Sequence, residues 1–268
     1  MTYFTFLAWC VGIPLLILAF LNWQDYRRGH RLPRSLRGWS ATAVVIAHVV
    51  VALIYTTPWD NYLVATNVWW YNPQLITGLV LGWVPIEEYT FFVLQTMLCS
   101  LWLHFLARRL PFKPLPAALE GGRMRWLSAG LVTLLWLPFV VILMLGWQPG
   151  TYLALILAWA LPPIILQLGF GADILWRYRA LVFWGTVAPT LYLAIGDTFP
   201  ISAGTWTIAP TQSTGIFLGS LPIEEFIFFL MTNMLVVLGT VLVLAKESHE
   251  RAPKALVERM HQWVSTMK

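Results

Sequence analysis

Residues 77–92 read TGLVLGWVPIEEYTFF, and residues 214–229 read TGIFLGSLPIEEFIFF. The two segments lie 137 residues apart and share ten of their sixteen letters, including the run Pro-Ile-Glu-Glu. The same separation pairs further residues that apolar composition alone would not match: Tyr55 with Tyr192, Asp60 with Asp197, Trp69 with Trp206 and Pro73 with Pro210. The chain therefore contains an internal repeat, which predicts two structurally equivalent halves.

The repeated segments lie in a strongly apolar chain. Of its 268 residues, 59% are hydrophobic and 11% are charged, whereas charged residues make up about 25% of an ordinary soluble domain. This composition excludes a soluble globular domain, a disordered chain and a nucleic-acid-binding protein. A helix needs about 20 apolar residues to cross the hydrocarbon core of a bilayer. Seven stretches meet or approach that length: 3–22, 40–57, 75–107 (interrupted at Pro85-Ile86-Glu87-Glu88), 127–146, 150–168, 180–196 and 223–245.

The basic residues divide the connecting segments into two kinds. All 17 lysines and arginines fall in the segments 23–39, 108–126 and 169–179 or in the C-terminal tail. The alternate segments contain none: 58–74, 147–149 and 197–213. Lysine and arginine accumulate on the cytoplasmic side of membrane proteins, so the sequence predicts an outside N-terminus and a cytoplasmic C-terminus. The net charge of +5 then reflects topology and not an acidic partner.

The spans and the repeat together predict an architecture. The predicted fold class is an all-α polytopic membrane protein with seven transmembrane helices, in which two parallel three-helix repeats are joined by one connecting helix. The predicted division assigns 1–110 to the first repeat, 111–149 to the connecting helix, and 150–268 to the second repeat with a cytoplasmic tail. A ligand site is expected between the two halves.

Half of the twelve acidic residues have no lysine or arginine near them in sequence, and they form three repeat-related pairs: Asp60 with Asp197, Glu87 with Glu224, and Glu88 with Glu225. Burial penalises the charged form of a carboxyl group without a cationic partner, so such a group keeps its proton and can donate it. The other six lie among basic residues and are predicted to be solvated surface: Asp25, Glu120, Asp173, Glu247, Glu250 and Glu258.

The Glu-Glu pairs also have a structural interpretation. Pro85 and Pro222 are typical of the first turn of a helix, where a glutamate complements the helix dipole. Adjacent helical residues point about 100° apart. One glutamate of each pair can therefore cap the helix while the other faces inward.

Aromatic residues follow each acidic pair at helical spacing. An acid and a phenylalanine share a helix face in four cases: Glu87 with Phe91, Glu88 with Phe92, Glu224 with Phe228, and Glu225 with Phe229. Ring faces attract cations, so this arrangement suits a reaction that passes through a carbocation, although packing of the rings alone is the commoner outcome. The repeat-matched aromatic residues are further candidates for substrate binding: Trp69, Trp206, Tyr55 and Tyr192. Trp70 and Tyr71 fit an interfacial belt.

The duplicated P-I-E-E-[YF]-x-F-F motif at 85–92 and 222–229, together with P-W-D-N at 58–61, resembles the small membrane lycopene cyclases. This family occurs as two separate subunits or as fused forms, and the resemblance to a fused form covers nearly the whole chain. It implies acid-catalysed cyclisation of lycopene ends to β-rings in the cell membrane. No electrons are exchanged, so no cofactor and no metal are expected. The motif leaves open ε- or γ-rings and C50 substrates.

The resemblance also implies roles for the acidic residues. One glutamate from each motif would act as acid or base, with Asp60 or Asp197 polarising or relaying the proton. The expected partners are lycopene and other linear carotenoids, the lipid bilayer and other carotenoid-pathway enzymes. A proton-coupled transporter is the alternative from a different class, because it also uses paired carboxyls within the membrane. A transporter would need a water-lined route from both faces, whereas these carboxyls cluster toward one.

Overall fold

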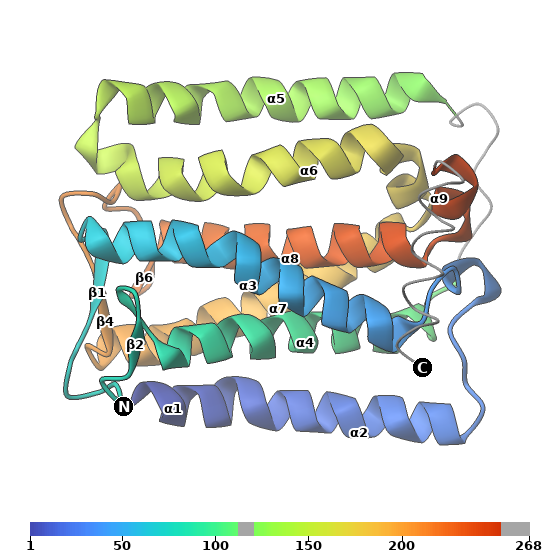
Figure 1. Ribbon diagram of the computed structural model, residues 1–268, viewed down its shortest axis with the longest axis horizontal. Coiled ribbons are helices and arrows are strands. Elements are labelled where there is room, and N and C mark those ends of the chain that lie inside the picture. The colour runs from blue at the N-terminus through green and yellow to red at the C-terminus, as the bar shows by residue number, and fades with distance from the viewer. Residues whose placement is uncertain (112–120, 253–268) are drawn as a thin grey trace.

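The computed structural model describes residues 1–111 and 121–252, which form a bundle of long helices lying side by side (Figure 1). Lys113, Glu120 and the tail residues after position 252, Glu258 among them, lie outside the described residues. Within the described residues, seven helices are long and apolar enough to cross a membrane, which confirms the predicted number of spans: Tyr3–Arg27, Ala41–Ala65, Ile86–Ala107, Gly122–Leu145, Gln148–Arg177, Arg179–Ser202 and Ile223–Leu244.

The first span combines α1 (Tyr3–Phe6), a π-helical turn (Leu7–Gly12) and α2 (Ile13–Arg27). The remaining helices follow in chain order: α3 (Ala41–Ala65), α4 (Ile86–Ala107), α5 (Gly122–Leu145), α6 (Thr151–Arg177), α7 (Arg179–Ser202), α8 (Ile223–Leu244) and the short α9 (Lys246–Arg251). Short 3-10 turns cover Arg34–Leu36 and Gln148–Gly150.

The described residues are not purely helical, because six short strands among them form three antiparallel pairs at one end of the bundle (Figure 1). Two pairs are hairpins: β2 (Val80–Leu81) with β3 (Val84–Pro85), and β5 (Phe217–Leu218) with β6 (Leu221–Pro222). The third pair joins β1 (Trp69–Tyr71) to β4 (Trp206–Ile208), so that Tyr71 lies opposite Trp206. This last pair joins the two halves of the chain at the same end of the bundle.

Two helices run further than the hydropathy pattern predicts. α3 continues through Pro58 to Ala65, and α7 continues to Ser202. The placement of Asp60 and Asp197 in the connecting segments 58–74 and 197–213 was therefore wrong, since both residues are helical. Hydropathy falls at these polar residues, but helical hydrogen bonding does not depend on side-chain polarity, and both carboxyls are buried inside the bundle. Pro58 removes only one backbone donor from the hydrogen bonds of α3, and the helix continues past it.

Two other helix boundaries differ from the predicted ones. Residues 75–85 form a loop and the β2–β3 hairpin, and α4 begins only at Ile86 with Pro85 at its N-cap position. α6 continues through most of the predicted segment 169–179 to Arg177.

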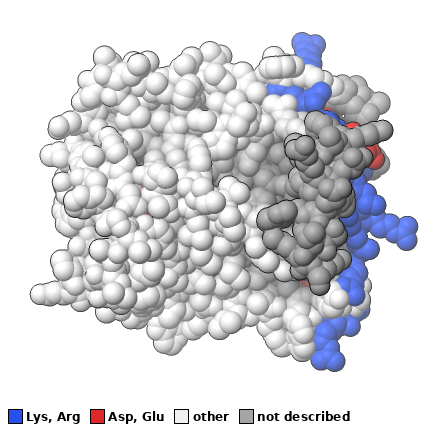
Figure 2. All heavy atoms as spheres, in the orientation of Figure 1, with Lys and Arg blue, Asp and Glu red and all other residues white. Residues whose placement is uncertain are grey.

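The described lysines and arginines gather at the end of the bundle opposite the strands (Figure 2). Asp25 and Asp173 lie at this end, and the prediction that they are solvated was wrong, because each is about 95% buried. Arg109 holds the two oxygens of Asp25 at 2.8 and 3.0 Å, and Arg251 holds those of Asp173 at 2.9 and 2.5 Å. A bidentate arginine satisfies a carboxylate without exposing it to water.

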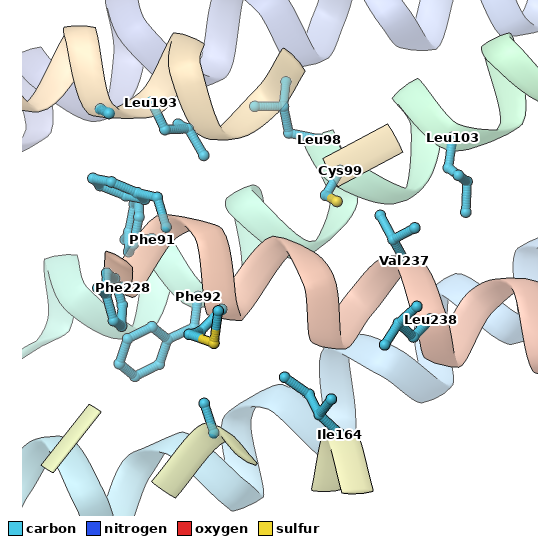
Figure 3. Packing of buried hydrophobic residues seen from close by; sticks show 14 of the residues in the cluster. Phe91, Phe92, Leu98, Cys99, Leu103, Ile164, Leu193, Phe228, Val237 and Leu238 are labelled. Carbon is cyan, nitrogen blue, oxygen red and sulfur yellow. The ribbon is translucent and has the colours of Figure 1, made fainter. Parts of the chain in front are cut away.

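α4 and α8 form the centre of the bundle. Figure 3 shows their phenylalanines meeting near the start of the two helices, and the rings of Phe91 and Phe229 lie 6.2 Å apart. Further along, the Gln95 amide donates to the Thr232 hydroxyl at 2.8 Å. α5 packs on the outside of α6 (Figure 1). The other helices therefore surround α4 and α8, the two helices that carry Glu-Glu in their first turn.

Candidate active site

The first glutamate of each pair holds a loop in place. The Oε1 atom of Glu87 accepts a hydrogen bond from the backbone N–H of Thr77 at 2.6 Å. Glu224 accepts the corresponding bond from the Thr214 N–H at 2.6 Å and a second from the Thr214 hydroxyl at 2.7 Å. Both glutamates are fully buried. Each therefore secures the segment that leads into the adjoining hairpin.

The second glutamate of each pair is held by tyrosines. Tyr3 and Tyr71 both donate to the Oε2 atom of Glu88, at 2.5 and 2.9 Å. Tyr152 donates to the Oε1 atom of Glu225 at 2.6 Å. Burial raises the pKa of the Tyr71 phenol well above its usual value, and the neighbouring Glu88 carboxyl raises it further. The Tyr71 hydroxyl therefore keeps its proton and remains a donor at neutral pH.

Glu88, Glu225 and Asp197 line a common narrow cavity of about 40 Å³ at the strand end of the bundle. No lysine or arginine is among the described residues that line it. The remaining lining residues are mostly aromatic: Tyr3, Phe6, Trp69, Tyr71, Phe91, Tyr152, Trp206, Ile208, Phe228 and Phe229. Three carboxyl groups thus face one another across an apolar, aromatic space.

Asp60 and Asp197 differ in their surroundings. Asp60 is fully buried, and neither of its oxygens has a hydrogen-bond partner among the residues that the structure describes. The Oδ2 atom of Asp197 is likewise buried without such a partner, but Asp197 lines the cavity.

The structure brings eight of the fourteen predicted site residues to this cavity: Glu88, Glu225, Asp197, Trp69, Trp206, Phe91, Phe228 and Phe229. The other six do not line it: Asp60, Glu87, Glu224, Phe92, Tyr55 and Tyr192. Phe92 and Tyr55 line a separate cavity further along the bundle. Tyr192 is 43% exposed on the outer surface of α7.

Sequence reasoning missed the tyrosines that hold the glutamates. Tyr3 and Tyr152 occupy matching places, because their backbone N–H groups donate to Leu75 and Gln212, which are themselves repeat-related. They lie 149 residues apart and not 137, so a search at one fixed separation does not pair them. The sequence places Tyr71 in an interfacial belt, whereas in the structure its hydroxyl group donates a hydrogen bond to Glu88. A comparison of the two repeats that allows a gap between their first and second spans would pair Tyr3 with Tyr152.

Comparisons with known proteins identify the family of the chain. A family model described as lycopene cyclase matches residues 1–106 and 149–243. A lycopene beta-cyclase of Halobacterium salinarum is 37% identical over 241 residues, which cover 90% of this chain and 95% of the relative. A bifunctional lycopene cyclase/phytoene synthase of Podospora anserina is 39% identical over 201 residues, covering 71% of this chain and 33% of the relative. No solved structure matches the chain. The chain belongs to the lycopene cyclase family.

Proposed function

We propose that this protein cyclises the linear ends of lycopene to β-rings by acid catalysis. The observation that carries the proposal is the cavity in which Glu88, Glu225 and Asp197 face aromatic side chains, with no lysine or arginine among its described lining residues. A carboxyl group without a cationic partner in such a place retains its proton and can transfer it to carbon. The archaeal relative, named lycopene beta-cyclase, supports the same ring type.

The chemistry requires one proton to be given and one to be taken. Protonation of C2 at the linear end leaves a cation at C1, and the C5=C6 double bond attacks this cation to close a six-membered ring. Loss of the proton at C6 then forms the β-ring. The site must therefore hold an acid near C2, a base near C6 and a surface that tolerates positive charge.

We assign the acid to Glu225 and the base to Glu88. Hydrogen bonds donated to a carboxylate stabilise its charged form, and Glu88 receives two from tyrosine hydroxyls where Glu225 receives one. Glu225 is thus better able to hold a proton before reaction, and Glu88 is better able to carry the charge needed to accept one. Asp197 lines the same cavity, so it can return the proton from Glu88 to Glu225 after each cycle.

Aromatic rings surround the position of the developing cation. Phe91, Phe228 and Phe229 line the cavity beside the carboxyl groups. A ring face attracts a cation by about 0.5–2 kcal/mol, with the larger value at desolvated sites. The rings also exclude water, which would otherwise capture the cation as an alcohol.

We infer that the two halves are parallel repeats related by a pseudo-twofold axis along the membrane normal. The matching bonds of Thr77 to Glu87 and of Thr214 to Glu224 support this relation. The gathering of described basic residues at one end supports a cytoplasmic location for that end. The carboxyl site would then lie toward the outer face of the cell membrane.

Expression in cells that accumulate lycopene, followed by pigment chromatography, tests the proposed function. We expect lycopene to be replaced by bicyclic β-carotene through a monocyclic intermediate. A Glu225→Gln variant, expressed to the same level, is the matched control and should leave lycopene unchanged. Unchanged lycopene with the unmodified chain would contradict the proposal, and ε- or γ-rings would overturn the assigned ring type.

A further inference from the structure

A second cavity lies deeper in the bundle, between α3, α4, α6 and α8. Its volume is about 360 Å³, several times that of the carboxyl cavity. Its walls are largely apolar, and Ala52, Pro163, Leu235 and Val236 are among the lining residues. Two amide groups of the wall donate to other residues of the same wall: Gln95 to the Thr232 hydroxyl at 2.8 Å, and Gln167 to the Leu235 carbonyl at 3.1 Å. We call this cavity the interhelical groove.

The interhelical groove adjoins the carboxyl cavity. Phe228 lines both. Three lining residues of the groove each lie four positions from a buried acid, which is about 6 Å along a helix: Thr56 from Asp60, Phe92 from Glu88, and Phe228 from Glu224. The outer end of the groove therefore begins one helical turn below the layer of carboxyl groups.

The groove is also long. Its lining residues on α8 run from Phe228 to Val243, a distance of about 22 Å at the helical rise of 1.5 Å per residue. It therefore follows the bundle axis away from the carboxyl groups, through most of the length of a spanning helix.

The groove opens to the outer surface of the bundle. Val51 and Tyr55 line it, and their side chains are 61% and 41% exposed. Both residues lie on the spanning helix α3, so this surface faces the acyl chains of the bilayer. A long apolar molecule dissolved in the bilayer can enter sideways without crossing a polar layer.

We propose that the interhelical groove holds the polyene chain of the linear carotenoid while one end of that molecule lies at the carboxyl groups. This inference rests on the proposed function. A linear carotenoid is a stiff apolar rod, so its chain must leave the reacting end along a straight path. The carboxyl cavity is too small to contain that chain, whereas the groove is apolar, elongated, adjacent to the site, with which it shares Phe228 as a wall residue, and open to the lipid.

Filling the groove tests the proposal. Ala52→Phe adds a ring to the wall and occupies part of the space in the groove. We expect about a tenfold loss of lycopene binding and of cyclisation, which corresponds to about 1.4 kcal/mol. Val51→Trp, at the exposed mouth of the groove, is a second variant that places little demand on folding. Val50→Trp is the matched control, because Val50 is 48% exposed on the same helix and does not line the groove.

Binding is measured separately from turnover by the visible circular dichroism of lycopene, an achiral polyene that gains a signal only in a chiral site. The purified protein carries Glu225→Gln for this measurement, so that bound lycopene is not consumed. Loss of the signal with Ala52→Phe and with Val51→Trp, but not with Val50→Trp, supports the proposal. Equal signals and equal cyclisation in all three variants would overturn it, as would a phospholipid that stays in the groove when lycopene is added. If protein with Glu225 intact bound lycopene in the groove but formed no cyclised product, the proposed function would be refuted instead.

Discussion

The two halves of the carboxyl site are built on one plan but differ in detail. Glu88 receives hydrogen bonds from Tyr3 and Tyr71, whereas Glu225 receives one from Tyr152. The residue that matches Tyr71 across the repeat is Ile208, which lines the cavity but has no hydroxyl group. A single difference between the halves thus leaves Glu225 with one tyrosine donor fewer.

The neighbouring residues differ as well. Trp59 is buried beside Asp60, stacks on Phe228 with a 5.8 Å separation of ring centroids, and donates to the Leu155 carbonyl. Its repeat partner is Gly196, beside Asp197. Asp60 does not line the carboxyl cavity, and Asp197 does. The difference teaches that a repeat supplies similar scaffolds, while the residues beside them give the two acids different surroundings.

The largest effect should come from replacing the two glutamates. Glu225→Gln removes the assigned acid and should lower cyclisation about 10²–10⁴-fold, the usual contribution of general acid catalysis, with lycopene left unchanged. Glu88→Gln removes the assigned base. The cation then still forms, and its proton should be lost from another carbon, giving ε- or γ-ring products. Pigment chromatography measures both, with size-exclusion profiles in detergent as the folding control. Identical product profiles for the two variants would contradict the assigned roles.

An intermediate effect is expected from the tyrosines. Tyr152→Phe removes the single tyrosine donor to Glu225, and hydrogen bonds to charged groups contribute about 1.5–3 kcal/mol, so cyclisation should fall about 10- to 100-fold. Tyr71→Phe leaves the 2.5 Å bond from Tyr3 to Glu88 in place and should cost about two- to fivefold. Initial rates of β-ring formation by purified protein distinguish the two. A larger loss of the β-ring formation rate for Tyr71→Phe than for Tyr152→Phe would contradict the proposed difference between Glu88 and Glu225.

The smallest effect concerns stability. The Thr214 hydroxyl donates to Glu224, so Thr214→Val should lower the free energy of unfolding by about 1 kcal/mol. The Thr77 hydroxyl has no corresponding bond to Glu87 among the described residues. Thr77→Val should therefore leave the thermal unfolding midpoint in detergent nearly unchanged. Equal midpoints for the two variants would show that the difference between these loops has no energetic consequence.

Much of the fold could be predicted because its signals are local or periodic. Seven apolar stretches and the one-sided placement of the basic residues need no knowledge of packing. Helix ends were less predictable: Asp60, Asp197 and Asp173 interrupt the hydropathy pattern, yet each lies in a helix that buries it. Hydropathy reports how a side chain interacts with lipid or water, and it says nothing about a polar residue that faces other helices.

The site was predictable only in part. The repeat singled out Glu88 and Glu225 as a pair, and both line the carboxyl cavity, but it treated Glu87 and Glu224 as equal candidates. Only the contacts with Thr77 and Thr214 distinguish the loop-holding glutamates from those that face the cavity. Tyr3, at the start of the chain, could not be connected to Glu88, 85 positions away, by any pattern within one helix.

The sequence by itself determined the number of spans, the repeat and which acids lie away from the basic residues, because each of these depends on residue type and spacing along the chain. The tertiary structure decided which acids meet, which tyrosines hold them and where the interhelical groove lies. These depend on how helices distant in sequence rotate and pack against one another. A rotation of about 100° separates adjacent residues of a helix, and that rotation decides whether a glutamate secures a loop or faces the cavity.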